Sequence, residues 1–181
     1  MKSLNIFEVT IHPIFHHIFL TIEHPEGQYQ YIGDALGRDC MIARFTYGWM
    51  RMYDGDGTKN ADWYTWEAEV LAPFDGMVKS IFINPITNKP GEITPGRASS
   101  IEFAREEGVI VTYAHVMEIC VEEGDIITAG QEVAKAGNNG YSRHPHIHVG
   151  AWINDSPLQI RFDLQAMGTQ LNKLGERIYL C

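Results

Sequence analysis

The stretch "VEEGDIITAGQEVAKAGNNGYSRHPHIHVG", Val121 to Gly150, contains the two patterns that decide the fold. In its first part, short apolar segments are separated by glycines at Gly124, Gly130 and Gly137. Glycine permits tight chain reversals because it adopts positive φ angles without a steric penalty. The stretch therefore predicts short β-strands in a sheet that folds sharply back on itself.

The second pattern is the histidine-rich end of the stretch, with His144, His146 and His148 at alternate positions. A β-strand sends alternate side chains to opposite faces, so the three imidazoles would share one face. Neighbouring imidazoles can bind a metal or transfer protons near neutral pH. The alternative is a half-exposed strand whose polar face is histidine, so a functional interpretation needs partner residues elsewhere in the chain.

Strand signals extend over most of the chain. From Glu67 onward, short apolar segments alternate with Gly and Asp-Gly turns, and residues 1–24 suggest two further short strands around Pro13. The segment "MIARFTYGWMRMY" also has the pattern of a strand, and only Leu164 to Leu174 has a weakly amphipathic helical pattern. We therefore predict an all-β fold, mainly antiparallel, with a short C-terminal helix. The expected organisation is a β extension over residues 1–40, a main domain over 41–160 and a tail over 161–181.

Composition limits the function. The 181 residues are 45% hydrophobic and 20% charged, which is typical of a globular domain. The net charge of -9 argues against a nucleic-acid partner, because binding to phosphates needs a basic face. Three widely spaced cysteines favour free thiols over a disulfide framework. The amino-terminal apolar run is interrupted by charged residues, histidines and a proline, so we expect no signal peptide and no membrane span, which favours the cytoplasm.

Four segments together carry a family resemblance: "VLAPFDGMV" (70–78), "YAHV" (113–116), "VEEGDIITAGQEVAKAGNNGYS" (121–142) and "HPHIHV" (144–149). Their order, spacing and residue types resemble the lysostaphin/LytM-type zinc endopeptidases, over roughly residues 42–150. These bacterial enzymes cut the peptide cross-links of cell walls. The resemblance implies a LytM-like, duplicated-hybrid-type β fold and a peptide or peptidoglycan-like ligand, or a partner protein.

The resemblance also implies roles for individual residues. His115 and His146 match the catalytic histidines of the family, which activate water and stabilise the tetrahedral intermediate. His148 matches one of three zinc ligands, and a catalytic zinc keeps a further position open for water. Asn138, Asn139 and Tyr141 match a segment near the substrate groove. The residue types of the two asparagines, just before a glycine, favour a structural role in a turn.

The two other zinc ligands are not evident. In one branch of the family they lie in a strand reading His-Arg-Phe-Ala-Tyr-Asp-Phe, and the matching stretch here is "ARFTYGW". Ala43 then stands at the histidine ligand and Gly48 at the aspartate ligand, and neither side chain has a donor atom. The leading hypothesis is a degenerate zinc site, with zinc absent or weakly bound, in a non-hydrolytic module that binds peptides or regulates a partner.

Several alternatives remain open. An active zinc metalloendopeptidase would need replacement ligands, either from the amino-terminal region or from the loop after the vacant positions, or a three-histidine site. The amino-terminal candidates are His12, His16, His17, His24, Asp39 and Cys40, and those of the loop are Asp54, Asp56 and Asp62. A three-histidine site would use His115, His146 and His148. A remote alternative is a biotinyl/lipoyl-like carrier domain, for which Lys89 would be the modified residue.

Overall fold

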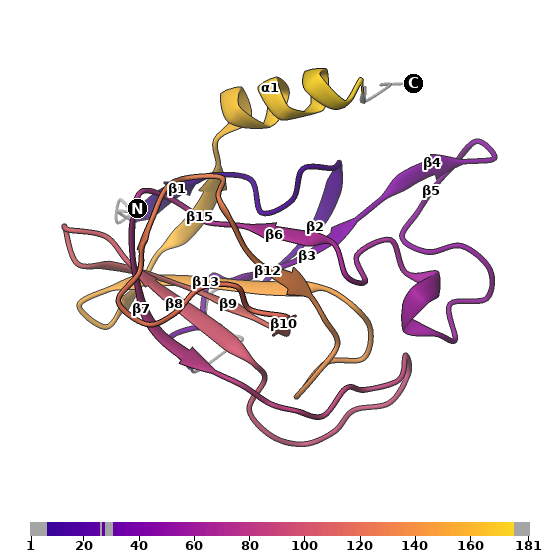
Figure 1. The fold of residues 1–181 in the computed structure, drawn as a ribbon, viewed down its shortest axis with the longest axis horizontal. Helices are drawn as coiled ribbons and strands as arrows, with labels where there is room; N and C mark the ends of the chain where they lie inside the picture. The colour runs from indigo at the N-terminus through magenta and orange to yellow at the C-terminus, as the bar shows by residue number, and fades with distance from the viewer. Residues whose placement is uncertain (1–6, 26, 28–30, 176–181) are drawn as a thin grey trace.

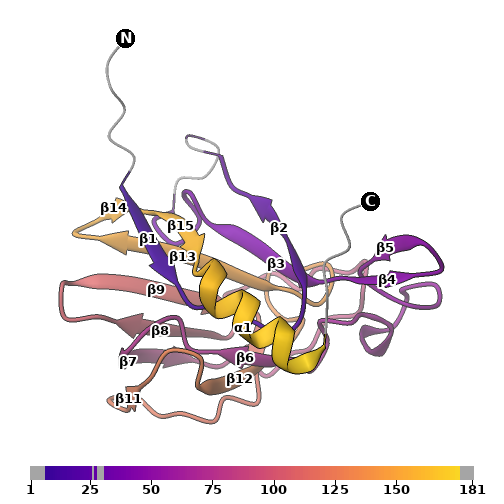
Figure 2. The same cartoon turned by 90° about the horizontal axis from the view of Figure 1, so that it is seen from above.

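The computed structural model describes residues 7–25, 27 and 31–175. Its described strands form one large antiparallel sheet of eight strands and three smaller sheets. The large sheet has the order β11-β7-β8-β9-β13-β3-β2, and β14 pairs with β13 (Figure 1 and Figure 2). Its strands are β2 (Phe19–Glu23), β3 (Arg38–Ile42), β7 (Gly76–Phe82), β8 (Ser100–Ala104), β9 (Val109–Ala114), β11 (Ile126–Ile127), β13 (Ile147–Ile153) and β14 (Ser156–Pro157). The prediction of a mainly antiparallel β fold is confirmed.

The hydrophobic core lies between this sheet and a three-stranded sheet, β10-β12-β6. The smaller sheet consists of β6 (Glu69–Leu71), β10 (Val116–Met117) and β12 (Glu132–Ala136). Along β9, alternate residues are buried, as expected when one face of a strand packs on a core. Strand β13 is buried over five successive residues because β9 and β3 flank it and both of its faces are covered. A residue on β13 is therefore held firmly in place.

The ends of the described chain pack against each other. Strand β1 (Glu8–Ile11) pairs in parallel with β15 (Gln159–Phe162), and helix α1 (Leu164–Leu174) follows β15 (Figure 2). Asp163 begins this helix by accepting hydrogen bonds from the backbone N–H groups of Gln165 and Ala166. The helix lies at the predicted residues, Leu164 to Leu174. The domain boundary that we expected at residue 40 falls inside strand β3. None of the helices in the described part of the chain is long and apolar enough to cross a membrane.

The stretch expected to carry the lost zinc ligands forms a hairpin. Strand β4 (Arg44–Thr46) pairs only with β5 (Trp49–Arg51), and this two-stranded sheet extends away from the body of the protein (Figure 2). Gly48 lies in the exposed turn with φ of 81°, a left-handed conformation that suits glycine. A short 3-10 helix, η1 (Asn60–Asp62), follows the hairpin.

A close approach between two backbones positions the turn at residues 31–37. A Cβ atom added at Gly150 on β13 would lie 1.8 Å from the carbonyl oxygen of Gly33. At Gly37, an added Cβ would lie 2.9 Å from the carbonyl oxygen of Val149. Only glycine therefore allows this turn to lie against β13.

We predict that Gly150→Ala lowers the free energy of unfolding by roughly 1–3 kcal/mol, because the turn must move to accommodate the methyl group. Chemical denaturation measures the change. Gly168→Ala in α1 is a matched control: its Cβ would meet nothing within 4 Å, so we expect a gain of up to about 1 kcal/mol from helix propensity. Equal effects of the two substitutions would contradict the close approach.

Candidate functional site

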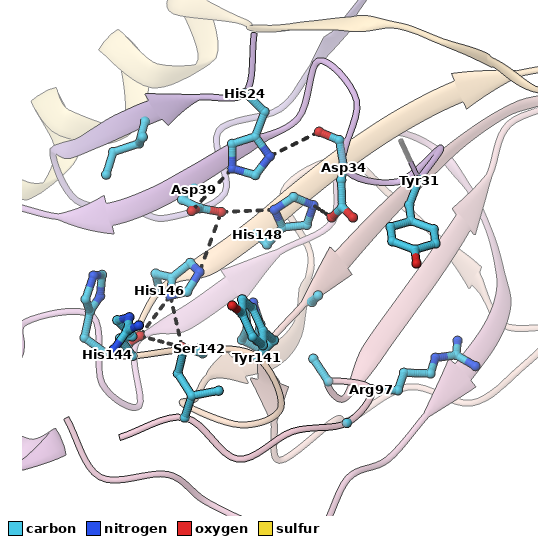
Figure 3. A pocket seen from close by; sticks show the side chains of 17 residues that line it. His24, Tyr31, Asp34, Asp39, Arg97, Tyr141, Ser142, His144, His146 and His148 are labelled. Carbon is cyan, nitrogen blue, oxygen red and sulfur yellow. Dashed lines mark hydrogen bonds and ion pairs between the residues drawn. The ribbon is translucent and has the colours of Figure 1, made fainter. Parts of the chain in front are cut away.

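Three side chains converge at one point, two from adjacent strands and one from the residue that follows the next strand. His148 on β13 lies directly opposite Asp39 on the neighbouring antiparallel strand β3, so both side chains point to the same face. His24 follows β2, which pairs with β3 on its other side. One ligand atom from each of these three residues lies within 4.8 Å of the other two (Figure 3). Among residues 7–25, 27 and 31–175, this is the one group of this kind.

Each histidine contacts Asp39 through one ring nitrogen. The Nδ1 atom of His148 lies 3.0 Å from Oδ1 of Asp39, and the Nε2 atom of His24 lies 3.4 Å from Oδ2. The other nitrogens face the 31–37 turn: His148 Nε2 lies 2.9 Å from the carbonyl oxygen of Gly33, and His24 Nδ1 lies 3.1 Å from that of Asp34. Both rings are therefore oriented by backbone carbonyl groups.

These contacts fit a bound cation. A neutral imidazole has one N–H group and one lone pair. If each ring donates its N–H to a carbonyl group of the turn, the nitrogens that face Asp39 both carry lone pairs. These two nitrogens and the Asp39 carboxylate are then three hydrogen-bond acceptors in contact, with no donor among them. A metal ion removes this conflict, and metal-binding histidines usually donate their outer N–H to such a carbonyl. Two imidazole nitrogens and one carboxylate are a suitable ligand set for zinc.

In the absence of a cation, protons must provide the positive charge. The hydrogen bond to Asp39 raises the pKa of His24 above its ordinary value, and this outweighs the opposing effect of burial. Burial raises the pKa of Asp39, but hydrogen bonds from His148 and His24 outweigh it and hold that pKa well below the usual range. Asp39 is therefore a carboxylate at neutral pH, in the form that binds metal.

His115 and His146 lie beside the cluster. His115 is at the break between β9 and β10 with φ of 67°, and its Nδ1 atom lies 2.8 Å from the carbonyl oxygen of Asn139. The Nδ1 atom of His146 lies 2.8 Å from the carbonyl oxygen of His144, while its Nε2 atom lies 3.6 Å from Oδ1 of Asp39. The two ring centroids are 4.5 Å apart. Both rings are thus anchored through Nδ1, which leaves Nε2 for chemistry.

Burial keeps these two histidines neutral. It lowers the pKa of His115 well below the ordinary value and lowers that of His146 to about 4. Both rings are therefore unprotonated at pH 7, which is the form that a general base must have, but a pKa this far below 7 makes each a weak base in the metal-free protein. The geometry thus places two neutral histidines beside a cluster whose ligand atoms suit a metal.

The structure separates the histidines that the sequence groups together. Strand β13 begins at Ile147, and His144 lies before it in a turn, where its ring stacks on Trp63 with centroids 4.5 Å apart. The expectation that three imidazoles share one strand face is therefore wrong, because only His148 lies within β13, while His144 and His146 both precede it. The three-histidine alternative does not match the observed cluster either, since His148 is the only member of that set within it.

The remaining predicted residues divide into scaffold and surface. Asn138 and Asn139 are buried, and the side chain of Asn139 accepts a hydrogen bond from the Ser99 N–H and donates one to the Val116 carbonyl. This position fits the turn interpretation better than substrate contact. Tyr141, in contrast, is 75% exposed and lines the pocket next to the cluster.

Neither Ala43 nor Gly48 belongs to the cluster. Ala43 is buried directly after β3, and Gly48 lies at the hairpin turn. Of the proposed replacement ligands, His24 and Asp39 lie at the cluster. The other candidates lie elsewhere. Cys40 is buried at the next position of β3, and His16 contacts Glu69. The carboxylates of the loop accept hydrogen bonds within that loop: Asp54, Asp56 and Asp62. No sequence spacing distinguishes His24 and Asp39, because strand pairing alone brings them together with His148.

The cluster forms one wall of the larger pocket. The pocket has a volume of about 1290 Å³, which exceeds that of typical sites for small molecules and suits a segment of peptide. His115, His146 and His148 contribute to its lining, as do His24 and Asp39. A ligand in this pocket could therefore contact all five of these residues.

The fold and the cluster define a β protein of metallopeptidase type. The family model described as Peptidase family M23 matches residues 61–160, more than half of the chain, so the protein belongs to that family. It is 29% identical over 82 residues to an uncharacterized metalloprotease of Buchnera aphidicola subsp. Baizongia pistaciae, a match that covers 45% of this chain and 21% of the relative. The chain thus spans about a fifth of that relative's length.

Two solved structures share the fold. One is a variant of the catalytic domain of EnpA, a prophage-encoded M23 protein from Enterococcus faecalis, with 17% identity and a TM-score of 0.52 over 79% of this chain and 87% of that one. The other is lysostaphin of Staphylococcus simulans, with 18% identity and a TM-score of 0.51 over 79% of this chain and 47% of that one. The family match favours the peptidase fold over the carrier-domain alternative, for which Lys89, between β7 and β8, would be the modified residue.

We predict that the metal-free protein loses stability as the pH falls from 7 to 5. The folded pKa of His146 is about 4 and its ordinary value is 6.5, so the unfolded state binds more protons between these values. His146 alone contributes a loss of about 2 kcal/mol over this range. The raised pKa of His24 acts in the opposite direction, so wild type should be compared with His146→Gln by denaturation at both pH values. An unchanged pH dependence in the variant would contradict a buried neutral His146.

Proposed function

We propose that this protein is a zinc-dependent endopeptidase of family M23 that cleaves cell-wall-type peptides, with His24, Asp39 and His148 as the metal ligands. The observation that carries the proposal is the convergence of these three side chains, with their outer histidine nitrogens bound to backbone carbonyls. The ligands thus replace those that Ala43 and Gly48 cannot provide. The family and the fold make zinc the expected metal.

Each residue then has a defined task. When bound, zinc supplies a Lewis acid that activates a water molecule and polarises a peptide carbonyl group. His146, fixed through Nδ1, presents Nε2 toward the cluster, where it accepts the proton of the attacking water. His115 donates its Nδ1 N–H to the Asn139 carbonyl, so its Nε2 carries a lone pair that can accept a proton, and the protonated Nε2 can then donate a hydrogen bond to the developing oxyanion.

The pocket and the relatives favour a peptide as substrate. The pocket is open and lined by His115, His146 and Tyr141, so an extended chain can lie across the cluster. Lysostaphin, which shares the fold, is described as an antimicrobial peptidase. Together with the resemblance of the four sequence segments, this supports the cross-linking peptides of bacterial cell walls as the substrate class.

The non-hydrolytic module inferred from the sequence rests on the absence of ligands at Ala43 and Gly48. Because these positions lie outside the observed cluster, their lack of donor atoms does not exclude zinc. The two functions share the same pocket and the same fold. They differ in whether a metal is bound and whether peptide bonds are broken.

We predict that two sets of alanine variants separate binding from catalysis. Variants of His24, Asp39 and His148 should lower zinc affinity by more than about 100-fold, because each removes a ligand. Variants of His115 and His146 should retain zinc but lose about 10²- to 10⁴-fold in turnover, because each removes a proton acceptor or a hydrogen bond in the transition state. Zinc content is measured by mass spectrometry, and turnover on purified peptidoglycan and on pentaglycine.

His16→Ala is the matched control, since His16 contacts Glu69 and not the cluster. It should leave zinc content and turnover unchanged. If the purified wild type takes up no zinc and cleaves neither substrate, the peptidase proposal is wrong and the non-hydrolytic module takes its place. Zinc binding that survives both His24→Ala and Asp39→Ala would show that other residues hold the metal.

A further inference from the structure

Arg97 is a pocket-lining cation without an acidic partner among the described residues. Three described arginines form ion pairs, Arg38 with Glu23, Arg105 with Glu107 and Arg161 with Glu8, whereas Arg97 shares the lack of an ion pair among the described residues with Arg44, Arg51 and Arg143. The protein has 23 acidic and 14 basic residues, so carboxylates are in excess. A shortage of acidic side chains therefore does not explain why Arg97 has none beside it.

The guanidinium group of Arg97 is already held in place. It lies 4.3 Å from the ring centroid of Phe82, and its Nη2 atom lies 3.4 Å from the hydroxyl oxygen of Ser100. Stacking on an aromatic ring fixes the plane of a guanidinium without using its N–H groups. Because a guanidinium has five N–H donors, most remain available to a ligand.

The loop that carries Arg97 is tied to the catalytic region. The Ser99 N–H donates a 2.7 Å hydrogen bond to the side chain of Asn139, whose backbone carbonyl holds His115. The buried side chain of Asn88 donates to the carbonyl groups of Gly140 and Ser142. These hydrogen bonds tie loops 83–99 and 137–146 together and place Arg97 on the same connected part of the protein as the histidines.

The pocket has charges of both signs. Asp34 and Asp39 line it at the metal-binding cluster, whereas Arg97 and Arg143 are its basic lining residues. In Figure 3, Tyr141 lies between His146 and Arg97. A peptide that places a backbone carbonyl at the histidines can therefore extend past Tyr141 toward Arg97. The group that best matches an oriented guanidinium is a carboxylate, which accepts two parallel hydrogen bonds.

We propose that Arg97 anchors a carboxylate-binding subsite, so that the preferred ligands are peptides that carry a carboxylate beyond the cleavage position. The carboxylate comes from an acidic side chain or from a free C-terminus. That the bound peptide is also cut rests on the proposed function. Binding at Arg97 requires neither metal nor turnover.

Fluorescence anisotropy with the metal-free full-length chain tests this proposal. The probes are amino-terminally labelled hexaglycine amides with one glutamate at each position in turn, their glutamine counterparts, and hexaglycine with a free or an amidated C-terminus. We expect one glutamate peptide, or the free C-terminus, to bind about 5- to 10-fold more tightly than its neutral counterpart. Which pair shows the difference identifies the source of the carboxylate.

Variants locate the subsite. Arg97→Gln should abolish the preference, and Arg97→Lys should keep part of it, because a charge remains without the planar fork. Arg51→Gln, in the hairpin outside the pocket, is the matched control and should keep the full preference. The proposal is wrong if the wild type binds each charged peptide and its neutral counterpart equally tightly. It is also wrong if the preference for a carboxylate survives Arg97→Gln, or if only Arg143→Gln abolishes it. Because the assay uses no metal, a failure of the peptidase proposal leaves this result unaffected.

Discussion

The contact between Asp39 and His148 across strands β3 and β13 is the interaction on which the site depends. It sets a carboxylate and an imidazole opposite each other on one sheet face, 3.0 Å apart. Strand β13 is buried from Ile147 to Ala151, and its pairing with β3 fixes the backbone positions from which the two side chains reach the pocket. The next strand outward, β2, brings His24 to the same carboxylate. Strands β3 and β13 and the residue after β2 thereby provide the three proposed ligands.

The turn at residues 31–37 completes this arrangement. Its carbonyl groups accept from the outer nitrogens of both histidines, which selects the ring orientations that direct the inner lone pairs at Asp39. The turn reaches this position because Gly150 and Gly37 leave room for the backbone. The ring orientations that suit a metal therefore depend on these two glycines as well as on the three proposed ligands. On the other side of the pocket, buried asparagines fix the loops that carry His115 and Arg97.

The sequence predicted the sheet and half of the site. Short apolar segments separated by glycine turns indicated the antiparallel β fold. The amphipathic pattern from Leu164 to Leu174 predicted the residues that form the helix. His115, His146 and His148 lie together, as their family resemblance implied. These features could be read from the sequence because local periodicity and short motifs carry them.

The other half of the site depends on long-range pairing. His24 lies 15 residues before Asp39, and Asp39 lies 109 residues before His148. Only the register of β2, β3 and β13 brings the three residues together. Aligning "ARFTYGW" with a family strand placed the ligand positions at Ala43 and Gly48, but that stretch forms a hairpin outside the sheet. His144 was misplaced for a related reason: the alternation with His146 continues the pattern of β13 into a turn where Trp63 stacks on the ring.

X-ray absorption spectroscopy at the zinc edge of the zinc-loaded protein tests whether His24, Asp39 and His148 hold the metal. We expect two imidazole nitrogens at about 2.0–2.1 Å and oxygen ligands at about 2.0–2.2 Å, with one imidazole lost in His24→Ala. A spectrum with three imidazoles, or one that His24→Ala and Asp39→Ala leave unchanged, would contradict the account.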